Sequence, residues 1–306
     1  MKPVKHIETK SGMTVNQLIE EMDASGVFGA GRLAKAVNIA EKMISDKDCK
    51  VFFGVAGAMV PGGMRKIIIQ MLEDGWVDVL VTTGATLTHD LIEALGCSHY
   101  QGSAAADDKK LHSDGVDRIY ESYMNNDVYE KLEKFCSEVF EKLHSEKGMS
   151  ISEFLHEFGK YCPKDSILRI CHEKNIPLFC PAIADSGIGL QVWNFIQSKK
   201  MVAVDAFDDL KEILDIAWTA KRSGIFYVGG GVPKNYIQQA MQFSHAASYG
   251  IQITTDRPEP GGSSGAELRE SISWGKLSED AEFVDVICDA TIALPLMHAA
   301  LKERIS

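Results

Sequence analysis

The sequence predicts an α/β fold, in which a doubly wound, mostly parallel sheet carries helices on both of its faces. Short apolar runs alternate with segments of helical periodicity along most of the 306 residues, as parallel sheets with crossover helices require. Several of the apolar runs end directly in glycine. A chain of this length can bury a large core, and it shows no internal repeat, low-complexity tract or linker. We therefore predict one domain over 1–306.

The predicted strands are short runs rich in valine, isoleucine and phenylalanine, and the predicted helices have apolar residues at helical spacing. The segment 119–165 is mostly helical and charged in its pattern, which predicts an insertion within the domain. The predicted strands cover 51–55, 77–81, 177–179, 201–204, 225–228, 251–254 and 283–287. The predicted helices cover 64–73, 208–220 and 235–243, with another running through 91–95 and an amphipathic one over 13–22.

Composition narrows the class of protein. The net charge of −11 argues against nucleic acid and anionic membranes as partners, and it is compatible with a small cationic substrate. The seven cysteines are scattered without a CxxC pair, which indicates reduced thiols in place of disulfides or zinc. Without a signal peptide or an apolar run of spanning length, we expect a soluble, cytoplasmic protein. Asp107-Asp108 indicates a solvated loop, so no metal site is predicted, and His99 and His112 are interpreted as structural.

Three predicted strands run into glycine, at Gly54–Gly57, Thr82–Gly84 and Gly229–Gly231. Ligands of open α/β sheets bind at the carboxyl ends of the strands, where glycine lets backbone amides approach a phosphate. Neither GxGxxG nor GxxxxGK[ST] is present. The glycines therefore indicate either tight packing or a dinucleotide site. Asp289, at another strand end, is in the same way either a ribose ligand or a solvated loop residue.

Lys276 is a candidate amine nucleophile. It follows Ser273-Trp274-Gly275, a sequence that suits a tight turn against an apolar wall, and it lies outside any run of charges. Partial desolvation of a lysine lowers the pKa of its amine and frees it to attack a carbonyl or an imine. Most lone lysines are solvated surface residues, so this interpretation depends on the surrounding motifs.

Several motifs in a fixed order resemble those of deoxyhypusine synthase and its relatives, from about Gly26 to the end of the chain. The motifs are Val77–Thr83, Asp90–Ile92, Gly115–Ile119, Pro181–Asp185, Gly229–Val232, Ser264–Ala266, Ser273–Lys276 and Asp289–Ala290. The resemblance implies a Rossmann-like NAD-binding domain, a homotetramer and an aminobutyl transferase. Enzymes of this family oxidise spermidine with NAD, transfer its aminobutyl group to the enzyme lysine as an imine, and pass it to a lysine of translation initiation factor 5A.

The resemblance also assigns residues. Lys276 becomes the catalytic lysine, with Glu270 and Trp274 as substrate-binding residues. His89 and Tyr236 occupy positions at which the family keeps a substrate-binding glutamate and a histidine. The implied NAD contacts are Gly57, Ala58, Met59, Thr83, Gly84, Asp185, Gly230, Gly231, Thr255, Asp256, Asp289 and Ala290.

The chain also departs from the family pattern. Leu190 and Ser263 stand where well-known members keep carboxylates that bind the polyamine. Fewer carboxylates weaken the binding of a ligand with several ammonium groups, unless Asp256 and Glu259 compensate. The acceptor could therefore also be putrescine or another small amine, as in homospermidine synthases, and the donor another polyamine or agmatine. A third hypothesis is a non-catalytic NAD-binding assembly protein, although such a protein does not need Lys276.

Overall fold

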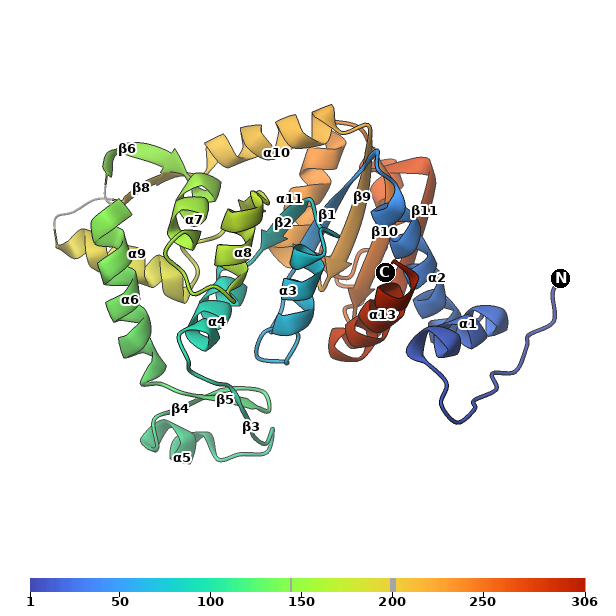
Figure 1. Cartoon of the computed structure of the whole chain (residues 1–306), viewed down its shortest axis with the longest axis horizontal. Helices are drawn as coiled ribbons and strands as arrows, with labels where there is room; N and C mark the ends of the chain where they lie inside the picture. Colours follow the sequence, from blue (N-terminus) through green and yellow to red (C-terminus); the bar gives the residue numbers. More distant parts are fainter. Residues whose placement is uncertain (144, 199–201, 306) are drawn as a thin grey trace. The chain divides into compact units, whose positions relative to one another are not determined.

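The computed structural model describes residues 1–143, 145–198 and 202–305 (Figure 1). The chain divides into two compact units, and each unit combines separate stretches of sequence. The single domain over 1–306 stays a prediction, and the predicted insertion 119–165 lies inside unit 2. Unit 1 comprises Met1–Gly57, Gly75–Val81 and Leu210–Ser306, and unit 2 comprises Ala58–Asp74 and Thr82–Asp209.

Unit 1 contains a parallel sheet in the order β11-β10-β9-β1-β2. The central strand, β1, pairs in parallel with β9, β9 with β10, and β10 with β11. β1 comes first in the sequence, β2 lies on one side of it, and β9, β10 and β11 follow in order on the other side. This is the doubly wound topology that the sequence predicts. The bounds are β1 (Cys49–Val55), β2 (Val79–Thr82), β9 (Arg222–Val228), β10 (Ala247–Thr254) and β11 (Leu277–Ile287).

Helices cover both faces of this sheet. The residues that lie against two strand glycines, one facing each side, identify these helices. Gly54 of β1 is in register with Tyr227 of β9, and a Cβ on Gly54 would lie 3.2 Å from Ile237 Cδ1 of α11 (Gly231–Gln242). Gly224 lies an odd number of residues from Tyr227, so its side chain faces the other way. A Cβ on Gly224 would overlap Met43 of α2 (Phe28–Ser45). The predicted α/β fold class is therefore confirmed.

The remaining helices of unit 1 agree with the sequence patterns. In α1 the Thr14 hydroxyl accepts a hydrogen bond from the Gln17 amide while the Gln17 side chain caps the Thr14 amide, which is a capping box. This helix confirms the amphipathic segment predicted over 13–22. The bounds are α1 (Val15–Ser25), α10 (Phe207–Thr219), which begins in unit 2, α12 (Glu270–Ser273) and α13 (Ala290–Arg304).

Unit 2 is mostly helical and holds two small sheets, β3-β5-β4 and β6-β8. The helices predicted within 119–165 are confirmed as α6 and α7, but the sequence pattern missed the strands β5 and β6. The strand predicted at 201–204 exists as β8 and pairs with β6, while Met201 lies outside the described residues. The helices are α3 (Arg65–Glu73), α4 (Gly84–Ala94), α5 (Asp108–Ser113), α6 (Val128–Leu143), α7 (Ile151–Gly159), α8 (Ile167–Lys174) and α9 (Gly187–Gln197). The strands are β3 (Tyr100–Gln101), β4 (Val116–Ile119), β5 (Ser122–Asn125), β6 (Ser145–Ser150), β7 (Leu178–Phe179) and β8 (Val202–Asp205).

The described residues contain no helix that is long and apolar enough to cross a membrane. Across the same ranges, no three His, Cys, Asp or Glu side chains gather as metal ligands would. Each of the seven cysteines is a free thiol.

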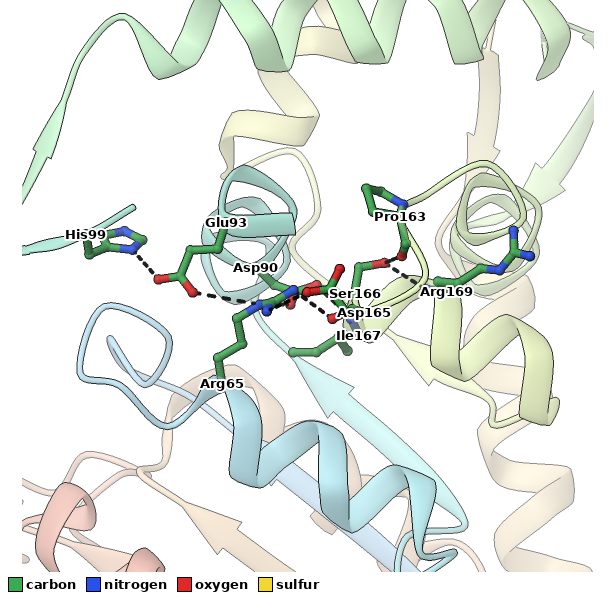
Figure 2. A network of polar contacts seen from close by, with 9 residues as sticks. All are labelled: Arg65, Asp90, Glu93, His99, Pro163, Asp165, Ser166, Ile167 and Arg169. Atoms are coloured by element: carbon green, nitrogen blue, oxygen red, sulfur yellow. Dashed lines mark hydrogen bonds and ion pairs between the residues drawn. The ribbon is translucent and has the colours of Figure 1, made fainter. Parts of the chain in front are cut away.

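A buried ion pair holds three helices of unit 2 together (Figure 2). Arg65 Nε of α3 donates to Asp90 Oδ1 of α4 at 2.7 Å, and the two side chains are 7% and 0% exposed. Asp90 Oδ2 accepts the backbone amide of Ile167, the first residue of α8, at 2.8 Å. Burial raises the pKa of Asp90 to about 7, although the Arg65 guanidinium and the Ile167 amide both oppose that rise.

We predict that Asp90→Ala lowers the free energy of unfolding by about 3–5 kcal/mol, because it leaves the Arg65 guanidinium buried without this partner. The measurement is urea denaturation followed by circular dichroism. Arg118→Ala, which breaks an exposed pair with Asp108 in the same unit, should leave stability nearly unchanged. A replacement of both partners, Arg65→Met with Asp90→Leu, should recover much of the loss. Equal losses in Asp90→Ala and Arg118→Ala would contradict the prediction.

Candidate active site

The carboxyl ends of β1 and β9 lie side by side in unit 1, where the strand order reverses. The Ala56 amide donates to the Val228 carbonyl at 2.9 Å, and a Cβ on Gly229 would lie 3.1 Å from the Ala56 carbonyl oxygen. Gly229 has a φ of +74°, which favours glycine. Gly57 and Gly230 therefore leave the sheet from neighbouring strands at one edge. In open α/β folds, ligands bind at such a switch point.

The same edge of unit 1 carries the next two predicted segments. The Cys288 amide donates to the Thr254 carbonyl at 3.2 Å, so Thr255-Asp256 and Asp289-Ala290 follow adjacent strand ends, those of β10 and β11. Asp289 is the N-cap of α13, and its Oδ1 accepts the Thr291 amide at 2.8 Å. Part of its hydrogen-bonding capacity is thus used by its own helix. A role in ribose binding stays a prediction.

The amino terminus of α11 fits a phosphate. Its N-cap is Gly230, which has no side chain to cap the helix, and the first turn contains no acidic residue. The Gly231 amide donates to Ser264 Oγ at 2.8 Å, and a Cβ on Gly231 would meet nothing within 4 Å. The backbone at Gly231 is open to a close approach, whereas Gly230 packs on Ser264, and the helix dipole favours an anion. These features fit the pyrophosphate of the dinucleotide that the sequence motifs imply.

The other predicted cofactor residues lie in unit 2. Thr83 is the N-cap of α4, and Gly84 packs so closely on Ser186 that a Cβ would overlap it. The Thr83-Gly84 loop is therefore next to Asp185, which is exposed just before α9. Two further predicted residues, Ala58 and Met59, lie in the loop before α3, where their carbonyls accept the amides of Gly62 and Met64.

Lys276 stands at the start of β11, after the tight turn that its sequence predicts. Helix α12 ends at Ser273 with Trp274 as its C-cap, Gly275 adopts a φ of +68°, and the Lys276 amide donates to the Ser271 carbonyl at 3.0 Å. The Lys276 ammonium lies 4.9 Å from the centroid of the Trp274 ring, within the range of a cation–π contact. Lys276 is half-buried and Trp274 is 59% exposed. The turn therefore presents the amine beside an aromatic face.

Lys234 is a residue that the sequence analysis missed. It is 1% exposed on α11, and its ammonium donates to the carbonyls of Ser263 at 2.7 Å and Ala266 at 2.6 Å. Burial lowers the pKa of Lys234 to about 8, an effect that Asp285 and Glu270 oppose and the charge of Lys276 reinforces. The ammonium thus holds the loop that precedes α12 and lies within electrostatic reach of the candidate nucleophile.

A second hydrogen bond fastens α12 to α11, since Gln238 Nε2 donates to Ser271 Oγ at 2.7 Å. The two predicted substrate residues nearby differ in exposure. Glu270, at the start of α12, is exposed, whereas Tyr236 of α11 is only 8% exposed. Burial favours packing over substrate contact for Tyr236. The signal for Lys234 in the sequence was a lysine between apolar positions of a helix that follows a glycine triplet.

His89 lies in unit 2 and belongs to a hydrogen-bonded chain. Its Nδ1 is 2.9 Å from Nε2 of His99, and Nδ1 of His99 is 2.7 Å from Oε1 of Glu93. Burial lowers the pKa of His89 to about 4, His99 lowers it further, and Glu93 opposes the shift. His89 is therefore neutral at pH 7. His99, which we interpreted as an isolated structural histidine, has His89 and Glu93 as partners.

We predict that Lys234→Met lowers the free energy of unfolding by about 2 kcal/mol, because two carbonyls lose their buried donor. Peptides that cover 263–266 should also exchange their amide hydrogens faster in hydrogen–deuterium exchange mass spectrometry. The matched control is Lys221→Met, which removes an exposed lysine of the same unit. If exchange in 263–266 is unchanged, Lys234 does not hold this loop.

Comparison with known proteins identifies the family of this chain. The family model for deoxyhypusine synthase matches residues 17–301. A Methanosarcina mazei protein named "Probable deoxyhypusine synthase 1" is 47% identical over 306 residues, 99% of this chain and 96% of the relative. An Archaeoglobus fulgidus protein of the same name is 42% identical over 298 residues, 97% of each chain.

A solved structure supports the fold alone. The crystal structure of an Entamoeba histolytica protein provisionally described as a deoxyhypusine synthase has a TM-score of 0.63 and 19% identity, covering 94% of this chain and 93% of that one. The match of the family model over nearly the whole chain and the identity to the archaeal relatives are decisive. The chain belongs to the deoxyhypusine synthase family.

Proposed function

We propose that this protein transfers the aminobutyl group of spermidine, in an NAD-dependent reaction, to a specific lysine of translation initiation factor 5A and so forms deoxyhypusine. The observation that carries the proposal is the placement of Lys276 by the α12 turn, beside Trp274, in a chain of this family. The protein would act in the cytoplasm as a homotetramer.

The chain's own residues supply the covalent chemistry. When bound, NAD would supply the redox chemistry, taking a hydride from the carbon beside the secondary amine of spermidine to leave an imine and returning it at the end to the imine of the acceptor. The neutral amine of Lys276 adds to the imine carbon, the bond from that carbon to the departing nitrogen breaks, and 1,3-diaminopropane leaves. Lys276 then holds the aminobutyl group as an enzyme imine until the acceptor amine displaces it, which leaves an imine on the acceptor that the returned hydride would reduce to the secondary amine of deoxyhypusine.

Other residues position these groups. Trp274 provides an aromatic face for the Lys276 amine and for the cationic donor. Glu270 contributes a carboxylate at the start of the same turn, where it attracts an ammonium group. For the cofactor, Gly230 and Gly231 would hold the pyrophosphate at the amino terminus of α11. The loop residues Thr255 and Asp256 would contribute further contacts at the same edge of the sheet.

A second candidate is the transfer of the same group to putrescine or another free amine. The observation in its favour is that this chain has non-acidic residues at positions where the resemblance implies carboxylates that bind the substrate. Leu190 is 60% exposed on the first turn of α9, and Ser263 contributes its carbonyl to Lys234. His89, where the family keeps a glutamate, is neutral at pH 7. A non-catalytic NAD-binding assembly protein is the third candidate, and such a protein has no use for the arrangement of Lys276 and Trp274.

The decisive experiment incubates the purified protein with NAD and spermidine, and offers either a factor 5A partner or putrescine as the acceptor. Products are followed by mass spectrometry. A gain of one aminobutyl group on the partner lysine, with release of 1,3-diaminopropane, supports the proposal. Homospermidine in place of that product moves the function to polyamine metabolism. If neither product forms although NAD binds, the proposal fails.

We predict that Lys276→Ala reduces the rate of transfer by on the order of a thousandfold or more, because the covalent step needs the amine. NAD affinity and the free energy of unfolding should change little. In the protein that keeps Lys276, borohydride added during turnover should reduce the enzyme imine to a stable adduct on this lysine, and mass spectrometry of peptides would locate it.

Lys302→Ala is the matched control. Lys302 also places its ammonium over a tryptophan, 5.7 Å from the centroid of Trp76, and lies in the same unit. This variant should transfer at the normal rate. Normal transfer by Lys276→Ala, or an adduct on another lysine, would show that Lys276 is not the nucleophile.

A further inference from the structure

Helix α4 presents a carboxylate and an imidazole that are joined through a second imidazole. His89 and Glu93 are four residues apart on this helix and share one face of it. His99, from the segment between α4 and β3, lies against both side chains, with its Nε2 2.9 Å from His89 Nδ1 and its Nδ1 2.7 Å from Glu93 Oε1. The order of the chain is therefore Glu93, His99, His89.

The carboxylate at the start of this chain is held in place. Figure 2 shows Glu93 between His99 and Arg65, with one oxygen toward each. Arg65 Nε lies 3.9 Å from Glu93 Oε2 and is itself fixed by its buried contact with Asp90. Glu93 thus connects the two histidines to Arg65, and through Arg65 to Asp90. Because Arg65 orients Glu93, the oxygen Oε1 is directed at His99.

These contacts determine where the protons lie. An ionised carboxylate only accepts hydrogen bonds, so Nδ1 of His99 must be the donor to Glu93. A His99 ring with a single proton carries it on Nδ1, so its Nε2 accepts a hydrogen bond and Nδ1 of His89 donates to it. A neutral imidazole that is protonated at Nδ1 has a free lone pair at Nε2.

We propose that Glu93 and His99 are positioning residues that hold His89 in the tautomer with an unprotonated Nε2, and that this nitrogen accepts a hydrogen bond from an ammonium group of the donor substrate. The identity of that ligand rests on the proposed function. His89 thereby replaces a carboxylate with a neutral acceptor, which selects for hydrogen-bond geometry more than for charge. Glu93 contributes the negative charge from two side chains away.

The first test measures the tautomer directly and does not depend on activity. Full-length protein labelled with ¹⁵N-histidine is studied by solid-state NMR at pH 7, and the His89 signals are identified from their absence in His89→Gln. The proposal expects a proton on Nδ1 and none on Nε2 of His89. A proton on Nε2 of His89, with His99 doubly protonated, would overturn it.

The second test measures spermidine binding by calorimetry in the presence of NAD. Glu93→Gln puts an amide donor beside His99 and favours the opposite tautomers, so the Kd for spermidine should rise about tenfold, and Glu93→Asp should restore part of the affinity. The control Glu173→Gln removes an exposed carboxylate that pairs with Arg169 on α8 and should leave the Kd unchanged. Equal affinity in Glu93→Gln and the unmodified protein overturns the assignment of the ligand.

The two tests separate this inference from the proposed function. If spermidine binds and its affinity depends on Glu93, but no aminobutyl group is transferred, the inference stands and the proposed function fails. If transfer occurs with a Kd and a KM that Glu93→Gln does not alter, the proposed function stands and the inference fails. Absence of saturable spermidine binding contradicts both.

Discussion

The parallel pairing of β1 with β9 is the constraint on which the candidate site in unit 1 depends. Because the two strands point the same way and the strand order reverses between them, their carboxyl ends deliver two glycine loops to one edge of the sheet. The Ala56 amide bonds the Val228 carbonyl, and a Cβ on Gly229 would lie only 3.1 Å from the Ala56 carbonyl oxygen, so the backbones of the two strands pack closely at that point. The sequence analysis treated close backbone packing and a ligand site as alternatives for these glycines. Here the two are compatible, because the packing at Gly229 leads directly into the open amino terminus of α11.

Buried charges then fix the loops around this framework. Lys234 reaches from α11 to the loop before α12, and because two carbonyls accept hydrogen bonds from its ammonium, the ammonium needs no carboxylate in direct contact. Arg65 and Asp90 fasten three helices in unit 2 in a comparable way. A buried ion pair contributes less to stability than apolar packing, but it demands one arrangement of its partners. In unit 1 the buried lysine therefore fixes the loop 263–266, and in unit 2 the buried ion pair fixes the start of α8.

The sequence was sufficient for most of the parallel sheet and for the turn at Lys276. The strands β1 and β9 contain continuous apolar runs, because they are buried on both faces, and such runs are visible without a structure. The short strands β3 to β6 were missed, since they are half-exposed or carry charged residues and do not alternate regularly. Lys234 was missed because lysines are rarely buried, and His99 because its contacts with α4 depend on how the intervening loop folds back.

The departures from the family motifs have different physical meanings once the contacts are known. Ser263 uses its backbone to bind Lys234, and that contact does not depend on which side chain stands there. Leu190 is exposed, so the loss of a carboxylate that the resemblance implies at this position would remove a charge and supply no new polar group. His89 alone brings a new set of partners, through His99 to Glu93. If the proposed tautomer holds, His89 presents a defined hydrogen-bond acceptor where the family resemblance implies a carboxylate, and a change in donor preference would then follow from this position.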